Sequence, residues 1–155
     1  MADIRVVWNP ALMAGDWLLT GSVLDTSREL VTAVAVSLFT HRTAEDDDRL
    51  PDGTTDRRGW WADHLAAEIY LGATPIGSRL WLLQREKQTE ETRLRADGYI
   101  REALAWITDM SLAERVDVNV TWFAFERLGA EITVIRGPKD SIAVRFESLW
   151  SEFEG

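Results

Sequence analysis

The feature that most restricts how this chain can fold is a change in its hydrophobic period near residue 115. Before that point apolar side chains recur every three to four positions, as in helices, and after it they alternate with polar ones, as in strands. The stretch "RVDVNVTW" at 115–122 alternates three valines and a tryptophan with polar residues, which predicts a strand with one buried face. We therefore expect an α+β protein with a helical first two thirds packed on a C-terminal sheet.

Two further strands are predicted downstream, in "AEITVIRG" at 130–137 and "SIAVRFESLW" at 141–150, separated by the turn-forming stretch "GPKD". Short connections between successive strands predict an antiparallel β-meander. The last strand either lies at an open sheet edge, where it can pair with a strand of a neighbour, or is covered by "IRVVWNP" at 4–10. Together with "GDWLLTG" at 15–21, that N-terminal segment predicts edge strands or arms.

Two main helices are expected before the sheet. A capping box, Thr26-x-x-Glu29, followed by an i, i+4, i+8 apolar stripe predicts a helix over 27–40. Thr89 and the acidic residues after it predict the start of a long helix over 90–109, and a short helix over 80–85 is expected to be capped by Ser78. The long helix carries an apolar stripe of Ala96, Ile100, Ala103, Leu104 and Ile107, widened by Tyr99, Trp106 and Met110.

The segment between the two main helices, 44–65, has no hydrophobic period and contains an acidic run, a proline and two glycines. Loops this long are usually functional or disordered. Because exposing both Trp60 and Trp61 would forfeit much of their burial free energy, we expect an ordered loop that is docked by its tryptophans. Adjacent side chains in an extended segment point opposite ways, so one ring is expected inside and the other at an interface.

Composition limits the classes of function. The 155 residues suit one domain, and the absence of cysteine excludes disulfides and thiol catalysis. A net charge of −9 argues against general nucleic-acid binding. The first residues lack the pattern of a signal peptide, and the longest apolar stretch, 30–39, is too short to span a bilayer, so we expect a protein that is soluble and intracellular when made.

Motifs for catalysis or ligand binding are incomplete. The stretch 72–79 has the glycine spacing of a phosphate loop, but Ser78 stands in place of the essential lysine and lies in no nucleophile elbow. The acidic run does not match a calcium-binding loop. His41 and His64 are too few for a zinc site. Asp63 and Glu68 are the pair to consider for a glycosidase, although among 26 acidic residues some pair will always look plausible.

Two long segments carry a family resemblance. "LPDGTTDRRGWWAD" at 50–63 and "GSRLWLLQREKQTEETRLRADGYIREALAWI" at 77–107 together resemble the tail baseplate wedge family of Mu-like bacteriophages. The helix "LVTAVAVSLFTHRTAEDD" before them and the strand-rich end after them follow the order of that family, so the resemblance covers nearly the whole chain. That family is similar in turn to the small wedge proteins of other contractile tails, which are compact α+β domains.

The resemblance implies a structural, non-enzymatic subunit of the virion tail baseplate, made in the host bacterial cytoplasm. It implies six copies around the tail axis and partners among other baseplate proteins: a larger wedge subunit, the hub and spike, the tail tube or the first sheath ring. The residues themselves predict no cofactor and no nucleic-acid or membrane partner, because the binding motifs are incomplete, the net charge is −9 and the longest apolar stretch is too short to span a bilayer. The candidates for protein interfaces are Arg57, Arg58, Trp60, Trp61, Arg79, Trp81, Val144, Phe146 and Trp150.

Two other functions remain open on the sequence. One is a cell-wall-degrading glycosidase associated with a phage tail, which would use Asp63 or Glu68 and would clear peptidoglycan suspensions. The other is a host-encoded adaptor outside any phage, which the neighbouring genes would distinguish.

Overall fold

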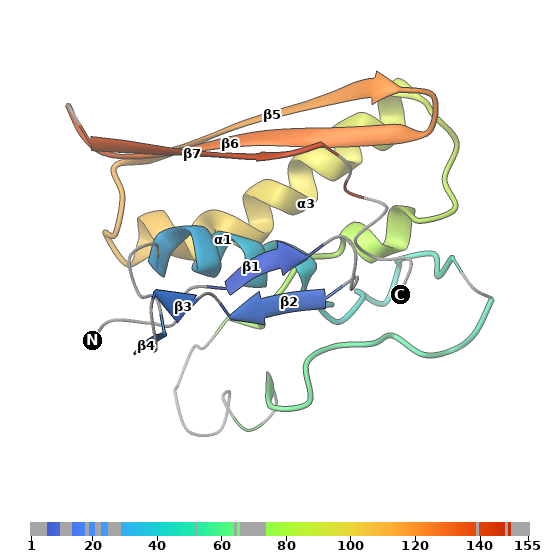
Figure 1. The fold of residues 1–155 in the computed structure, drawn as a ribbon. Coiled ribbons are helices and arrows are strands. Elements are labelled where there is room, and N and C mark those ends of the chain that lie inside the picture. Colours follow the sequence, from blue (N-terminus) through green and yellow to red (C-terminus); the bar gives the residue numbers. More distant parts are fainter. Residues whose placement is uncertain are drawn as a thin grey trace.

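The protein, seen in a computed structural model, is built from a sheet layer and a helix layer (Figure 1). The long helix α3 (Glu90–Asp109) crosses the inner face of a three-stranded sheet, and α1 (Glu29–Phe39) packs beside α3. This confirms the predicted α+β class. The structure describes residues 6–9, 14–17, 19–20, 23–24, 29–51, 53–63, 65, 74–138, 140–147 and 149.

The sheet is the predicted antiparallel meander of β5 (Arg115–Ala124), β6 (Arg127–Gly137) and β7 (Asp140–Phe146), in that order. In the middle of each strand the even-numbered residues face the helix layer and the odd-numbered ones face outward, as the alternation in 115–122 predicted. The prediction that the last strand reaches residue 150 was wrong. After Phe146 the chain turns inward, because Leu149 is fully buried and its N–H donates to the Leu128 carbonyl at 2.7 Å.

Helix α3 has the predicted bounds. The Thr89 hydroxyl caps its start by accepting the Thr92 N–H at 3.1 Å, and Glu90 and Glu91 lie in its first turn, where the helix dipole favours negative charge. All five residues of its predicted apolar stripe are buried. Met110 is instead 67% exposed, because it follows the last helical residue and the chain there leaves the helix layer.

The other helical predictions need small corrections. Helix α1 lies within the predicted 27–40, but its capping residue Thr26 falls outside the described residues. The short helix is a single 3-10 turn, η1 (Leu80–Leu83), all of it buried. Its N-cap residue is Arg79 rather than Ser78. The Ser78 hydroxyl still accepts the Leu80 N–H at 3.4 Å, and it donates to the Leu38 carbonyl at the end of α1, which ties the two elements together.

The N-terminal strands do not join the meander. Strands β1 (Val6–Asn9) and β2 (Ala14–Trp17) pair with each other, as do β3 (Leu19–Thr20) and β4 (Val23–Leu24). The expected edge strands therefore form two small hairpins of their own. Among the described residues, β1 does not cover β7.

Candidate protein-interaction surfaces

The residues considered for catalysis serve structure where they are described. The carboxylate of Asp63 joins two segments, because it accepts the N–H of Trp60 at 3.3 Å and the N–H of Ile76 at 3.1 Å. Its proposed glycosidase partner Glu68, and His64, fall outside the described residues. Within the described ranges no group of three or more His, Cys, Asp or Glu side chains could hold a metal ion, and no helix is long and apolar enough to cross a membrane.

The glycine-rich stretch that resembles a phosphate loop has a packing role. Gly77 has a φ of +97°, and a Cβ there would lie 2.3 Å from the Thr40 carbonyl oxygen. The close approach lets Ser78 donate its N–H to that oxygen at 2.9 Å and accept the Arg42 N–H at 3.0 Å. Glycine is therefore required here to clamp the end of α1, not to approach an anion.

Arginines, not tryptophans, dock the long loop. Arg57 donates through its guanidinium to the carbonyls of Ala44, Glu45 and Asp46, and Arg58 lies 4.4 Å above the ring of Trp81. The same Arg58 approaches both ring nitrogens of His41, at 3.3 and 3.4 Å. Burial, and then the charge of Arg58, lower the pKa of His41. The loop is thus held in place by its basic side chains.

The prediction that one tryptophan ring is inside was wrong. Trp60 is 39% exposed and Trp61 is 72% exposed, and the centroids of their two rings are 5.6 Å apart. The physical reason is the backbone before them. Positive φ angles at Arg58 (+54°) and Gly59 (+110°) turn the chain, so that the indoles point away from the part of the domain that the arginines contact. Both rings are available to a partner.

Arg79 and Trp81, two of the interface candidates, are engaged inside the chain. Arg79 donates to Glu102 at 3.0 and 3.1 Å and to Asp48 at 3.0 Å. Although its burial opposes the charge, these hydrogen bonds raise the pKa of Arg79. Trp81 is fully buried, and its indole N–H donates to the Arg42 carbonyl at 2.9 Å. Trp81 therefore belongs to the core and presents no surface to a partner, which corrects the expectation for it.

The outer edge of β5 is closed by two side chains of α3. The Val120 carbonyl accepts a hydrogen bond from Arg93 at 3.1 Å, and the Val118 carbonyl accepts one from Arg101 at 3.0 Å. Carboxylates on the same helix hold both guanidinium groups: Glu90 pairs with Arg93, and Asp97 accepts from Arg101 at 2.7 Å. Two of the carbonyls that a foreign strand would need on this edge are thus already bonded.

The same hydrogen bonds show which backbone groups β7 exposes. In an antiparallel strand the N–H and C=O of one residue point to the same side, and successive residues alternate. Since Val118 and Val120 point away from β6, the registers Val118↔Ile132 and Ile132↔Val144 make Val144 a ladder-bonded residue of β7. The residues that point to the outer edge are therefore Ser141, Ala143 and Arg145.

The outer edge of β7 is open in the part of the chain that the structure describes, where β6 is its one strand neighbour. Two interface candidates on this strand face inward instead: Val144 is half-buried, and Phe146 is buried with its ring 5.0 Å from that of Phe39. The third C-terminal candidate, Trp150, lies outside the described residues. The surface that β7 offers is its backbone rather than its large side chains.

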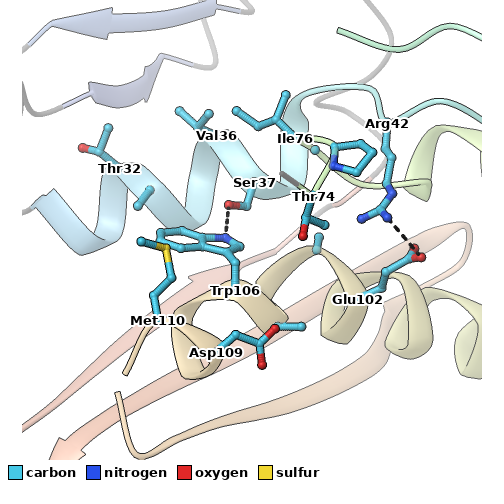
Figure 2. A pocket seen from close by; sticks show the side chains of 15 residues that line it. Thr32, Val36, Ser37, Arg42, Thr74, Ile76, Glu102, Trp106, Asp109 and Met110 are labelled. Carbon is cyan, nitrogen blue, oxygen red and sulfur yellow. Dashed lines mark hydrogen bonds and ion pairs between the residues drawn. The ribbon is translucent and has the colours of Figure 1, made fainter. Parts of the chain in front are cut away.

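Figure 2 shows a further surface, a groove of about 750 Å³ between α1 and α3. Apolar side chains form most of it, and Trp106 lies along it with its indole N–H donating to the Ser37 hydroxyl at 3.0 Å. That bond joins Trp106 of α3 to α1. The segment 74–77 and an ion pair of Arg42 with Glu102, at 3.8 Å, close one end.

Sequence reasoning missed two of these features. The groove depends on how two helices pack, which no local pattern encodes. The tip of the β5–β6 hairpin carries Phe123 and Phe125, both exposed, and a Cβ on Gly129 would lie 2.1 Å from the Phe123 ring. The stretch "FAF" at 123–125, just after the predicted strand 115–122, was the available signal, since small and polar residues rather than phenylalanines dominate the turns between strands.

Comparison with known proteins gives consistent matches. Residues 30–141 match the family model described as phage protein GP46. The chain is 44% identical over 119 residues to the baseplate protein gp46 of Escherichia phage Mu, covering 77% of each chain. It is 30% identical over 151 residues to the Mu-like prophage FluMu protein gp46 of Haemophilus influenzae, covering 97% of this chain and 99% of the relative. The family match begins in α1 and ends at the start of β7, so it includes both layers of the fold.

Proposed function

The chain belongs to the phage protein GP46 family, and on that premise we propose that it is a structural, non-enzymatic component of a bacteriophage tail baseplate. The name of its phage Mu relative, baseplate protein gp46, supports this role. More finely, we propose a wedge subunit of a contractile tail, folded as one domain over 1–155 and present in six copies. It would join the virion after synthesis in the host cytoplasm.

The observation that carries the proposal is the difference between the two sheet edges. Arg93 and Arg101 occupy the backbone acceptors of β5, whereas Ser141, Ala143 and Arg145 direct theirs outward from β7. An open edge can accept a strand from another chain, which provides main-chain hydrogen bonds without a deep pocket. We propose that β7 pairs with a strand of a neighbouring tail protein: the larger wedge subunit, the hub or tube, or the first sheath ring.

The loop offers a second contact. Trp60 and Trp61 are exposed while Arg57 and Arg58 fix the backbone that carries them. Aromatic side chains held on an ordered backbone are frequent anchors of protein interfaces, because little conformational entropy is lost when they bind. We propose that the two indoles pack against a neighbouring baseplate protein.

The test is tail assembly in a phage that carries this gene. Ala143→Pro removes an outward N–H of β7 and places a proline ring on the edge, so we expect loss of complete tails in electron micrographs and loss of plaque titre. Ala143→Val is the matched control, because it keeps the N–H and favours a strand. Normal tails with Ala143→Pro would exclude the β7 contact. Complete tails after deletion of the gene would exclude the baseplate role itself.

A further inference from the structure

The groove between α1 and α3 exposes apolar surface of α1, a helix with little polar surface of its own. In α1, Val34 is 0% exposed, whereas Val36 on the groove side is 40% exposed. At the far end of the groove Met110 is 67% exposed. No other helix among the described residues packs into this space. A helix that is apolar on nearly every side is normally buried on every side.

The polar groups that line the groove are largely satisfied within the chain. The indole N–H of Trp106 is bonded to Ser37, and Arg42 is paired with Glu102. Asp109 is different, since it makes no ion pair among the described residues and lies in the last turn of α3, which has no basic residue. The helix dipole is negative at this end, so the mouth of the groove favours a cation.

We infer that this groove receives an amphipathic helix of another tail protein, with an Arg or Lys of that helix beside Asp109. The inference rests on the proposed baseplate function. The shape supports a helix, because the groove runs between two helices and the small side chains of Ala33, Ala103 and Ala105 allow close approach. The acidic mouth supports a basic residue at one end of the apolar face.

The test uses single cysteines, which the chain allows because it has none of its own. Val36→Cys places a thiol in the groove, and Val34→Cys places one on the buried side of the same helix as the matched control. Alkylation by a maleimide is followed in the free protein and in assembled tails. We expect Val36→Cys to react readily in the free protein and several-fold more slowly in tails, and Val34→Cys to react slowly in both.

A photoreactive crosslinker on the Val36→Cys thiol then identifies the occupant in tails by mass spectrometry. We expect a crosslink to a helical segment of another tail protein that has an Arg or Lys within a turn or two of the crosslinked position. Asp109→Arg should lower incorporation into tails several-fold, and Asp109→Asn should lower it less.

Several outcomes would overturn the inference. A thiol at position 36 that is already protected in the free protein means that this chain covers its own groove. A crosslink to a second copy of this chain, or to a strand, means a different occupant. Equal reactivity in free protein and tails means that nothing binds there. Each of these leaves the proposed function intact if the chain is incorporated, whereas absence of the chain from purified tails defeats the proposed function instead.

Discussion

The two edges of the sheet differ in what happens to their backbone. On β5 the carbonyls of Val118 and Val120 are bonded to arginines of the neighbouring helix, whereas on β7 the outward groups have no strand partner among the described residues. Open edges promote aggregation, and proteins normally block them. This difference between the edges is the reason we propose that the chain associates through β7 and not through β5.

The closed edge arises from a simple arrangement on α3. Arg93, Asp97 and Arg101 are spaced by four residues, so they form one row along the side of the helix that lies next to β5. Asp97 bonds Arg101, and Glu90 bonds Arg93, which keeps both guanidinium groups oriented. Nothing equivalent is described beside β7, because the neighbouring helix α1 contributes apolar side chains such as Phe39 to that side of the sheet.

The largest expected effect comes from proline placed on either side of β7. Val144→Pro removes a ladder hydrogen bond to β6, so we expect it to lower the free energy of unfolding by about 3 kcal/mol. Ala143→Pro removes an N–H that points outward, so we expect a loss of about 1 kcal/mol or less. Urea unfolding of both variants measures the difference. Equal losses would mean that the alternation assigned to β7 is shifted by one residue.

A second experiment opens the closed edge. In the double variant Arg93→Met, Arg101→Met the carbonyls of β5 lose their partners, so we expect concentration-dependent self-association in sedimentation experiments that exceeds that of the wild-type protein. The matching Arg93→Lys, Arg101→Lys variant keeps a donor at each position and should associate less. A double methionine variant that stays as monomeric as the wild type would show that the arginines do not protect the edge.

How much of the difference between the two edges the sequence could predict depends on how far apart in the sequence the interacting residues lie. The strand 115–122 and the helix 90–109 were predictable, because both are set by local periods and a cap at Thr89. The closed edge was not, since it depends on which strand lies beside α3. The interface residues expected on β7 were its large apolar ones, Val144 and Phe146. The hydrogen-bond alternation instead directs the backbone groups of Ser141, Ala143 and Arg145 to the edge.

The loop shows the same limit. An ordered loop was expected for a reason that proved wrong, because both tryptophans are exposed and arginines hold the loop instead. Arg57 and Arg58 dock on carbonyls and on the Trp81 ring, which are distant in sequence, and positive φ angles at Arg58 and Gly59 reverse the direction of the following side chains. Whether such residues form a turn or anchor the loop depends on backbone angles that a local sequence pattern does not give.

The smallest expected effect is a pH dependence of protein stability that arises at the loop and at neither sheet edge. Carboxylate hydrogen bonds raise the pKa of Arg93 and Arg101, so the closed edge stays charged at any ordinary pH. His41, beside the loop, has a pKa lowered below the model-peptide value of 6.5, mainly by burial. The folded protein therefore binds fewer protons there than the unfolded chain does, so this contribution is complete above pH 6.5 and is lost as the pH falls below it. We expect the urea midpoint to decrease on acidification from about pH 7.5 to about pH 5.5, a window above the carboxylate range.

His41→Gln should flatten that slope, whereas His64→Gln, which removes the only other histidine, is the matched control. A slope that persists in His41→Gln would assign the pH dependence to another group and leave the Arg58–His41 contact without a role in loop stability.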